Sequence, residues 1–271
     1  MDNTVLVLKT VNANMTSAYD SSFVYPRQGM VSCPDWDPAP ACGHGLHGFI
    51  RGTGNGGLAS WQSDSVWLII RVNVDDIVDL EDKVKFRCGE VIYAGDQKTA
   101  TDMLKAAYPD APVIGCTATA GYKGTATAGD KGTATAGYSG TATAGDYGTA
   151  TAGDSGTATA GDSGTATAGD NGTTTAGDNG TATAGDNGTA TAGDYGTATA
   201  GDNGTATAGT YGTAIAGNYG IASAREGGDI HIRWYDCRSN RYRTAVGYVG
   251  EDGILPNVLY HVVNGKLVEK R

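Results

Sequence analysis

Hydrophobic residues gather at the two ends of this 271-residue chain, and the middle holds few large aliphatic side chains. Up to residue 116 and beyond residue 228, short runs of Val, Ile, Leu and aromatic residues alternate with polar positions. Between them, Thr, Ala and Gly recur for more than a hundred residues. A globular core of that size would need more Leu, Ile and Phe. The pattern predicts ordinary folded material at both ends and a different architecture between them.

The N-terminal hydrophobic runs predict an α/β domain over residues 1–116. Four segments have the β-branched and aromatic content of strands: TVLVLKTV (4–11), SFVY (22–25), VWLIIRVNV (66–74) and EVIYAG (90–95). Asp96 is suited to cap a short helix, QKTATDMLKAAY, over residues 97–108.

The C-terminal segment, residues 229–271, predicts a small β cap. DIHIRWYD alternates polar and apolar residues, and RYRTAVGYVG is able to pair back on it. In VLYHVVNGKLVEK, the Asn264-Gly265 pair is a strong signal for a type I′ hairpin.

The middle repeats one phrase, T-A-T-A-G-x-x-G, every eight residues from Thr117, and a degenerate copy at 221–228 closes the run. Fourteen units without an insertion are typical of a stacked array. A disordered linker of this composition is the alternative, but it has no reason to keep a constant period. T-A-T-A suits a short strand with Thr on one face and Ala on the other. In A-G-D-x-G, we expect Gly to supply the positive φ of a turn and Asp to bond its own turn.

Two units, sixteen residues, would complete one coil, so residues 117–228 predict a parallel β-solenoid of about seven coils in a mainly β protein. Strands about 4.8 Å apart give a rod about 30 Å long. We expect Ala to point inward, because buried Thr hydroxyls would each need a partner. Thr174, which replaces an Ala, argues mildly against this. The open ends of such a rod would recruit further strands, so both flanking domains are expected to cap it.

The variable turn positions also stack every sixteen residues. Tyr122 and Tyr138 lie one coil apart, as do Tyr195 and Tyr211, so short tyrosine stacks are expected along the edges. The acidic residues form two columns in which like charges about 5 Å apart repel modestly. Bonding within the turn is the expected compensation, with bound cations as the alternative. The columns contain Asp130, Asp146, Asp162, Asp178 and Asp194 on one edge, and Asp154, Asp170, Asp186 and Asp202 on the other.

Charge and composition exclude some function classes. The net charge is −10, and no basic stripe is present, which argues against a nucleic-acid partner. The sequence contains no run of 18 apolar residues, so it does not predict a membrane-spanning helix. The N-terminal residues lack the basic segment followed by a long apolar segment that is typical of a secretion signal. The five cysteines are odd in number and scattered, which is typical of reduced thiols, so we expect a cytoplasmic protein.

As a sixteen-residue coil, Ala136–Thr151 is AGYSGTATAGDYGTAT. This phrase resembles the repeat of the bacterial ice nucleation proteins, A-G-Y-G-S-T-x-T-A-G, over residues 117–228. The resemblance implies a β-solenoid with outward T-x-T rows that order water. The residues that match those rows are Thr125, Thr127, Thr133, Thr135, Thr141, Thr143, Thr149, Thr151, Thr157, Thr159, Thr165, Thr167, Thr181, Thr183, Thr189, Thr191, Thr197, Thr199, Thr205 and Thr207.

The chain departs from that family in two respects. Both half-coils here carry T-A-T, and about seven coils stand where the family has dozens. Ice nucleation depends on a large surface, so this chain is expected to nucleate poorly, whereas ice binding needs less area. The N-terminal region joined to A-T-A-G repeats also resembles uncharacterised bacterial and phage-borne proteins. This resemblance does not suggest any particular activity.

The loop CPDWDPAPACGHGLH brings four potential zinc ligands together: Cys33, Cys42, His44 and His47. Their spacing is not that of a common zinc finger, so we expect structural roles, with no metal and no cofactor.

Two further N-terminal motifs carry weak signals for enzymes. Gly52, Gly54 and Gly57 match G-x-G-x-x-G but lack the strand-to-helix context of a dinucleotide site. CGHGLHGFIRG faintly resembles the G-x-G-[IL]-[HY] segment of ADP-ribosyltransferase-like folds, which implies a catalytic glutamate, for which Glu90 is the nearest candidate.

The preferred interpretation is a non-enzymatic structural or interaction protein, in which a rigid capped rod displays Thr, Asp and Tyr ladders. Ice binding through the Thr rows is one alternative, and an enzyme or metal site in the N-terminal domain is another. The edges of the rod also suggest self-association as a side-by-side dimer.

Overall fold

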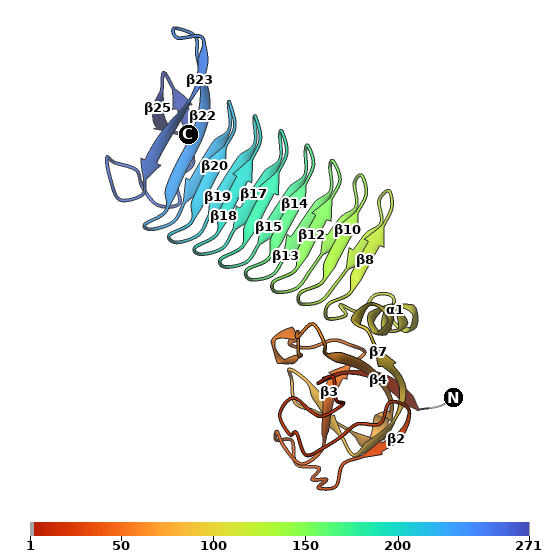
Figure 1. The fold of residues 1–271 in the computed structure, drawn as a ribbon. Coiled ribbons are helices and arrows are strands. Elements are labelled where there is room, and N and C mark those ends of the chain that lie inside the picture. The colour runs from red at the N-terminus through yellow and green to blue at the C-terminus, as the bar shows by residue number, and fades with distance from the viewer. Residues whose placement is uncertain (1–2, 271) are drawn as a thin grey trace. The chain divides into compact units, whose positions relative to one another are not determined.

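The computed structural model describes residues 3–270, and these fall into two compact units. The first unit runs to Thr117 and includes Ala128–Asp130, and the second contains the rest of the repeat and the C-terminal region. Strands account for 44% of the chain and helix for 6%, which confirms a mainly β protein. Figure 1 follows the strands in chain order.

The first unit is built on a seven-stranded sheet in the order β2-β7-β4-β1-β3-β6-β5. Its strands pair antiparallel, because loops and 3-10 turns, not crossover helices, join them. Val7, Leu8, Leu68 and Phe86 are fully buried in its core. The elements are β1 Thr4–Val11, β2 Gly29–Ser32, β3 Leu46–Ile50, η1 Gly56–Leu58, β4 Val66–Asn73, η2 Val74–Asp76, β5 Ile77–Asp79, β6 Val84–Phe86 and β7 Cys88–Gly95.

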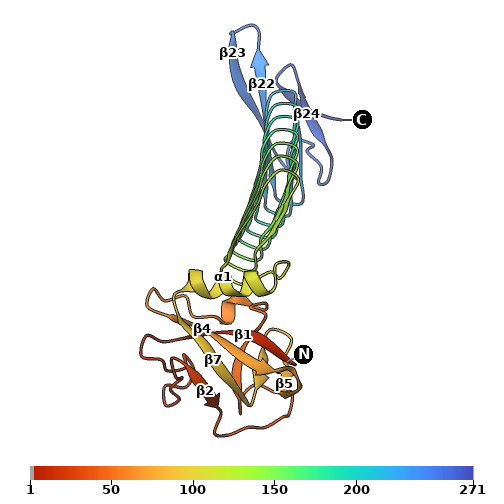
Figure 2. The ribbon, with the colours of Figure 1, turned by 90° about the vertical axis from the view of Figure 1, so that its right-hand side faces the viewer.

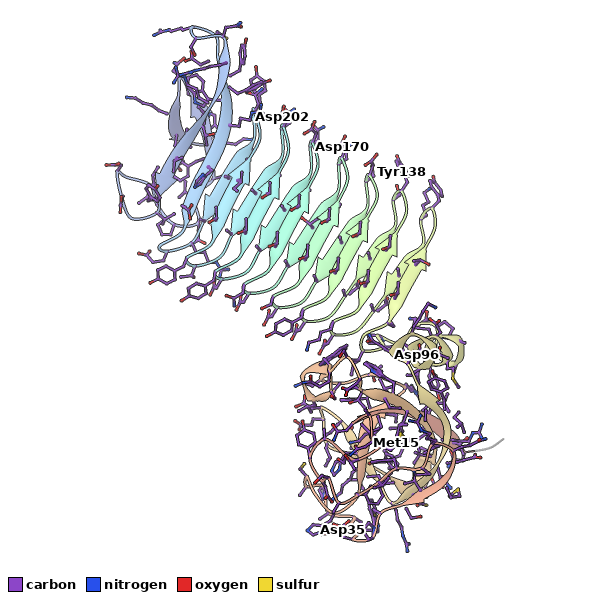
Figure 3. The ribbon with its side chains drawn as sticks, viewed as in Figure 1. Met15, Asp35, Asp96, Tyr138, Asp170 and Asp202 are labelled. Atoms are coloured by element: carbon purple, nitrogen blue, oxygen red, sulfur yellow. The ribbon has the colours of Figure 1, made fainter. Side chains whose placement is uncertain are left out.

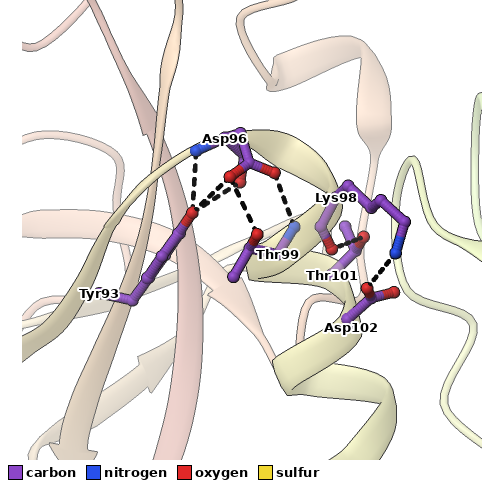
Figure 4. Close-up of polar contacts among 6 residues, drawn as sticks. All are labelled: Tyr93, Asp96, Lys98, Thr99, Thr101 and Asp102. Carbon is purple, nitrogen blue, oxygen red and sulfur yellow. Dashed lines mark hydrogen bonds and ion pairs between the residues drawn. The ribbon is translucent and has the colours of Figure 1, made fainter.

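Helix α1, Gln97–Ala107, begins where the sequence predicts it. Asp96 is the N-cap, and its Oδ1 accepts a hydrogen bond from the backbone N–H of Thr99 at 2.8 Å (Figure 4). Tyr93 donates its hydroxyl to the same carboxylate. These bonds, led by the Thr99 amide, lower the pKa of Asp96 to about 2. No helix within residues 3–270 is both long and apolar enough to cross a membrane.

Three of the four predicted N-terminal strands are confirmed, as β1, β4 and β7, and the fourth is wrong. Residues 22–25 form a turn and a single bridge between Thr16 and Val24. Asp20 starts the turn by accepting the N–H of Ser22. The apolar side chains nevertheless serve the core, since Tyr25 is buried and stacks edge-on against Phe23.

The repeat forms a solenoid of two parallel sheets, with strands alternating between them along the chain (Figures 1 and 2). Each residue pairs with the one sixteen positions on, as Thr165 does with Thr181, which confirms the sixteen-residue coil. One sheet holds β8 Thr117–Ala120, β10 Thr133–Ala136, β12 Thr149–Ala152, β14 Thr165–Ala168, β16 Thr181–Ala184, β18 Thr197–Ala200 and β20 Thr213–Ala216; the other holds β9 Thr125–Thr127, β11 Thr141–Thr143, β13 Thr157–Ala160, β15 Thr173–Ala176, β17 Thr189–Ala192, β19 Thr205–Ala208 and β21 Ile221–Ala224.

Alanine points inward, as predicted. Ala166, Ala182 and Ala198, successive rungs of one sheet, are each 0% exposed. Thr174 takes one inward position and is equally buried, and its hydroxyl lies 3.4 Å from the carbonyl oxygen of Thr189. Since a methyl group adds little buried area, the ladders between coils hold the rod together more than the core does.

The turns differ from the sequence prediction in which residue takes the positive φ. None of the fixed glycines at residues 121–220 does so; the second variable residue does, with φ near +55° at Ser155 and Asn171 alike. Gly156 donates its N–H to the carbonyl of Gly153 at 3.0 Å, closing each turn. Glycine is required for space: a Cβ on Gly156 would lie 2.8 Å from both the Ala152 Cβ and the Gly153 oxygen.

The aspartates also bond differently from the prediction. The Oδ1 of Asp154 accepts the backbone N–H of Asp170, one coil further on, at 3.1 Å, and Asp170 does the same for Asp186 at 2.9 Å. The expected bond within the same turn is therefore wrong: these two carboxylates each link one coil to the next. Asp170 and Asp202 lie along one edge of the rod, as Figure 3 shows. These charge-assisted bonds offset the repulsion within each column.

The C-terminal residues cap both sheets, within the second unit. Strand β22, Asp229–Asp236, extends one sheet by pairing parallel to β20, and β23, Arg241–Tyr248, folds back on it antiparallel. Strand β24, Tyr260–Val263, meets the other sheet at Ala222 and pairs with β25, Lys266–Glu269. Asn264 and Gly265 have φ of 51° and 82°, which confirms the predicted hairpin turn.

Candidate functional site: two outward threonine faces

Apart from β15, β20 and β21, each repeat strand presents two threonines to the solvent, on either side of one buried alanine. On β14 these are Thr165 and Thr167, which flank Ala166. The period of two in a strand sends alternate side chains to opposite faces, so the sequence T-A-T fixes this arrangement. The first threonine of a strand is mostly exposed and the second is mostly half-buried.

The threonines stack into regular rows because the strands pair in register. Thr149, Thr165 and Thr181 are successive partners, as are Thr151, Thr167 and Thr183. Neighbouring rungs are about 4.8 Å apart, and alternate residues along a strand about 6.6 Å apart. The hydroxyls and methyl groups therefore form a two-column grid on each sheet.

The structure distributes the predicted threonines over both sheets. Thr173 and Thr175, which the sequence prediction did not include, occupy the same outward rows, paired with Thr157 and Thr159. On one sheet lie Thr133, Thr135, Thr149, Thr151, Thr165, Thr167, Thr181, Thr183, Thr197 and Thr199; on the other lie Thr125, Thr127, Thr141, Thr143, Thr157, Thr159, Thr189, Thr191, Thr205 and Thr207.

The grids end near the cap. Ile215 follows Thr199 in its row and pairs on its other side with His231 of the cap strand. On the second sheet, Ile221 and Ser223 replace the threonine pair. Isoleucine and serine side chains thus replace threonines where the repeat meets β22 and β24.

The edge tyrosines lie face to face across neighbouring coils. The rings of Tyr122 and Tyr138 are parallel within 5° at a centroid distance of 5.7 Å, and those of Tyr195 and Tyr211 are 5.4 Å apart. All four rings are more than half exposed. Their role in pairing two rods side by side stays a prediction.

In the first unit, the four potential metal ligands line one cavity: Cys33, Cys42, His44 and His47. Within residues 3–270, however, no three His, Cys, Asp or Glu side chains are grouped so as to hold a metal ion. His44 instead contacts Asp35, with 3.1 Å between Nδ1 and Oδ2, and Cys42 accepts a hydrogen bond from Lys83.

The residues of the two weak enzyme motifs are not brought together with other groups that would form an active site. Glu90 is on β7 and pairs with Arg71 of β4 at 2.9 Å, outside the cavity that holds His44 and His47. Gly52, Gly54 and Gly57 lie in the loop and 3-10 turn between β3 and β4, and no α-helix begins at these glycines. They therefore lack the strand-to-helix turn of a dinucleotide site.

Comparison with known proteins finds similarity over the repeat region. An ice nucleation protein of Pseudomonas fluorescens is 35% identical over 98 residues, which is 35% of this chain and 8% of that protein. Ice nucleation proteins of Xanthomonas campestris pv. translucens and Pseudomonas syringae pv. syringae are 32% and 33% identical over 107 and 116 residues, 39% and 42% of this chain. The repeat is ice-nucleation-like.

This chain spans less than a tenth of the length of those relatives, with 7% and 9% of the latter two matched. The ice-nucleation-like repeat agrees with the β-solenoid and its outward T-x-T rows. The relatives are named for ice nucleation and not for an enzymatic reaction, and a similarity over the repeat region does not bear on the N-terminal domain. No protein-family model matches the chain, and no solved structure matches it significantly.

Proposed function

We propose that the threonine faces of the ice-nucleation-like repeat bind ice by ordering water on their grids. The observation that carries the proposal is the in-register pairing of outward threonines on both sheets. The hydroxyl and methyl groups keep a fixed spacing because the backbone beneath them is rigid. Binding to ice therefore does not require these side chains to lose much conformational entropy. The names of the curated relatives support the same reading.

The size of the faces sets the kind of activity. Six strands of each sheet carry a complete outward threonine pair, so each grid is about 24 Å long and two threonines wide. That area suits adsorption to existing ice better than the assembly of a new crystal. We therefore expect inhibition of recrystallisation, or thermal hysteresis, together with weak nucleation.

Charge placed on the grid is expected to remove this activity. A variant with lysine at one exposed threonine on each of four central strands should lose at least tenfold in recrystallisation inhibition, because a hydrated ammonium group interrupts the water positions. The substitutions are Thr165→Lys and Thr181→Lys on one face, with Thr173→Lys and Thr189→Lys on the other.

A matched control adds the same four charges at turns. Lysine occurs naturally at this turn position, as Lys123 and Lys131, and Asn171 and Asn187 are exposed there. The control carries Asn171→Lys, Asn179→Lys, Asn187→Lys and Asn203→Lys, and should keep the activity. Circular dichroism checks that both variants keep their strands. Absence of any ice activity in the unmodified protein would refute the proposal.

A rigid spacer is the second candidate function, and the capping of the rod favours it. Strands β22 and β24 cover the C-terminal end of each sheet, which stops the stacking of strands there. In this role the Thr, Asp and Tyr ladders would serve stiffness and display. Small-angle scattering is expected to show an extended, rigid middle segment, and a collapsed flexible one would contradict the spacer.

A further inference from the structure

The first unit contains a cavity of about 460 Å³ that the ice-binding proposal does not use. Residues of β1 and β3 line it, together with residues of the loops around 17–25 and 33–45. Its volume falls within the range of small-molecule sites.

The inner wall of the cavity gathers basic side chains from neighbouring strands. Lys9 comes from β1, His47 from β3, and Lys83 from the residue before β6, and the sheet order places these strands side by side. Lys85, which pairs with His47 across β3 and β6, is fully buried. Its Nζ donates to the carbonyl oxygens of Ala41 at 2.8 Å and Gly43 at 3.5 Å, so it holds the loop that forms the wall.

No carboxylate neutralises these groups. Among residues 3–270, neither Lys9 nor Lys83 takes part in an ion pair. The two acids that line the cavity are exposed at its rim and already have partners. Asp20 accepts hydrogen bonds from Ser22, and Asp35 contacts the ring of His44.

The cations therefore oppose one another's charge. Burial, followed by the charge of Lys83, lowers the pKa of Lys9 to about 8. Burial also lowers the pKa of His47 to about 4, with the charges of Lys83, Lys9 and Lys85 adding to the effect. The backbone N–H of Gly43 lies 3.4 Å from His47 Nε2, which as acceptor leaves the ring proton on Nδ1. An entering negative charge would relieve this repulsion.

Another part of the lining is apolar and aromatic. Leu46 and Phe49 from β3 and Leu58 from η1 contribute side chains, and Phe23 and Tyr25 complete the wall. The Nζ of Lys9 lies 5.8 Å from the centre of the Tyr25 ring. The cavity thus combines one cationic side with a surface suited to a hydrocarbon or ring.

We propose that this cavity binds a small organic anion, with its carboxylate or phosphoryl group between Lys9 and Lys83 and its apolar body against Tyr25, Leu46 and Phe49. The negative charge would supply the counter-ion that no carboxylate of the described residues provides. The site is independent of the threonine faces, so either proposal can fail without the other.

The test is isothermal titration calorimetry of the full chain with phenyl phosphate, benzoate and inorganic phosphate. Phenyl phosphate or benzoate should bind at least tenfold more tightly than inorganic phosphate, and the better of the two identifies the anionic group. Lys9→Met and Lys83→Met should each weaken that binding about tenfold or more, since each removes a charge-assisted hydrogen bond. Lys98→Met is the control, because Lys98 lies on α1 and pairs with Asp102.

A second measurement needs no variant. Near pH 8, Lys9 should react with an amine-acylating reagent faster than lysines of ordinary pKa, and bound phenyl phosphate should protect it. The proposal is overturned if none of the three anions shows saturable binding at millimolar concentration. It is equally overturned if both methionine variants bind as the unmodified protein does, or if inorganic phosphate binds as tightly as phenyl phosphate.

Discussion

Replacing Ala182 with leucine is expected to destabilise the solenoid by about 3 kcal/mol, which corresponds to a fall of roughly 6–12 °C in Tm. Ala182 is 0% exposed and stands in register between Ala166 and Ala198. The larger side chain would have to separate the two sheets. Because each rung is hydrogen-bonded to the next, neighbouring coils cannot move apart independently. Thermal unfolding followed by circular dichroism measures the effect.

The adjacent residue supplies the control. Thr181→Leu introduces the same side chain on the same strand but on the exposed face, and should change stability by less than about 0.5 kcal/mol. If the two leucine variants unfolded alike, close packing between the alanine faces would not be what limits residue size inside the rod.

Removal of the C-terminal cap, residues 229–271, is expected to convert the protein into concentration-dependent assemblies. The truncation exposes the edges of β20 and β21, whose partners β22 and β24 are lost. Parallel edges with free N–H and C=O groups, and a flat stack of alanines beside them, form a template for a second copy. Size-exclusion chromatography with light scattering should show species larger than the intact chain.

A deletion of one complete coil, Thr165–Gly180, is the matched control for the truncation. It joins Gly164 to Thr181, so the eight-residue phrase continues and the cap stays in place. This variant should remain the same in oligomeric state as the unmodified protein. Assemblies in the coil deletion, or none in the truncation, would show that the cap does not control edge pairing.

The repeat was predictable because its information is local and periodic. An eight-residue period with alternating Thr and Ala defines the strand, the coil and the inward face without reference to any distant residue. The helix cap at Asp96 and the Asn264-Gly265 turn were predictable for the same reason.

What the sequence concealed depends on contacts between distant residues. The role of Asp154 was misassigned because its acceptor contact is with the amide of Asp170, in another coil. The positive φ belongs to the variable residue and not to glycine because glycine is needed where successive turns approach closely. Likewise, the cavity of the first unit joins Lys9, His47 and Lys83, which no motif connects.

The equivalence of the two sheets bears on how the gene can change length. Insertion of a single octapeptide would send every later strand to the opposite sheet, where it would meet the same neighbours: threonine outside, alanine inside and an amide for each carboxylate. The strand β22 would then extend the sheet that begins with β9. Slippage of a tandem DNA repeat therefore needs no compensating substitution, and each unit lengthens the rod by about 2.4 Å. Odd and even numbers of octapeptides would therefore differ in which of the two sheets β22 extends.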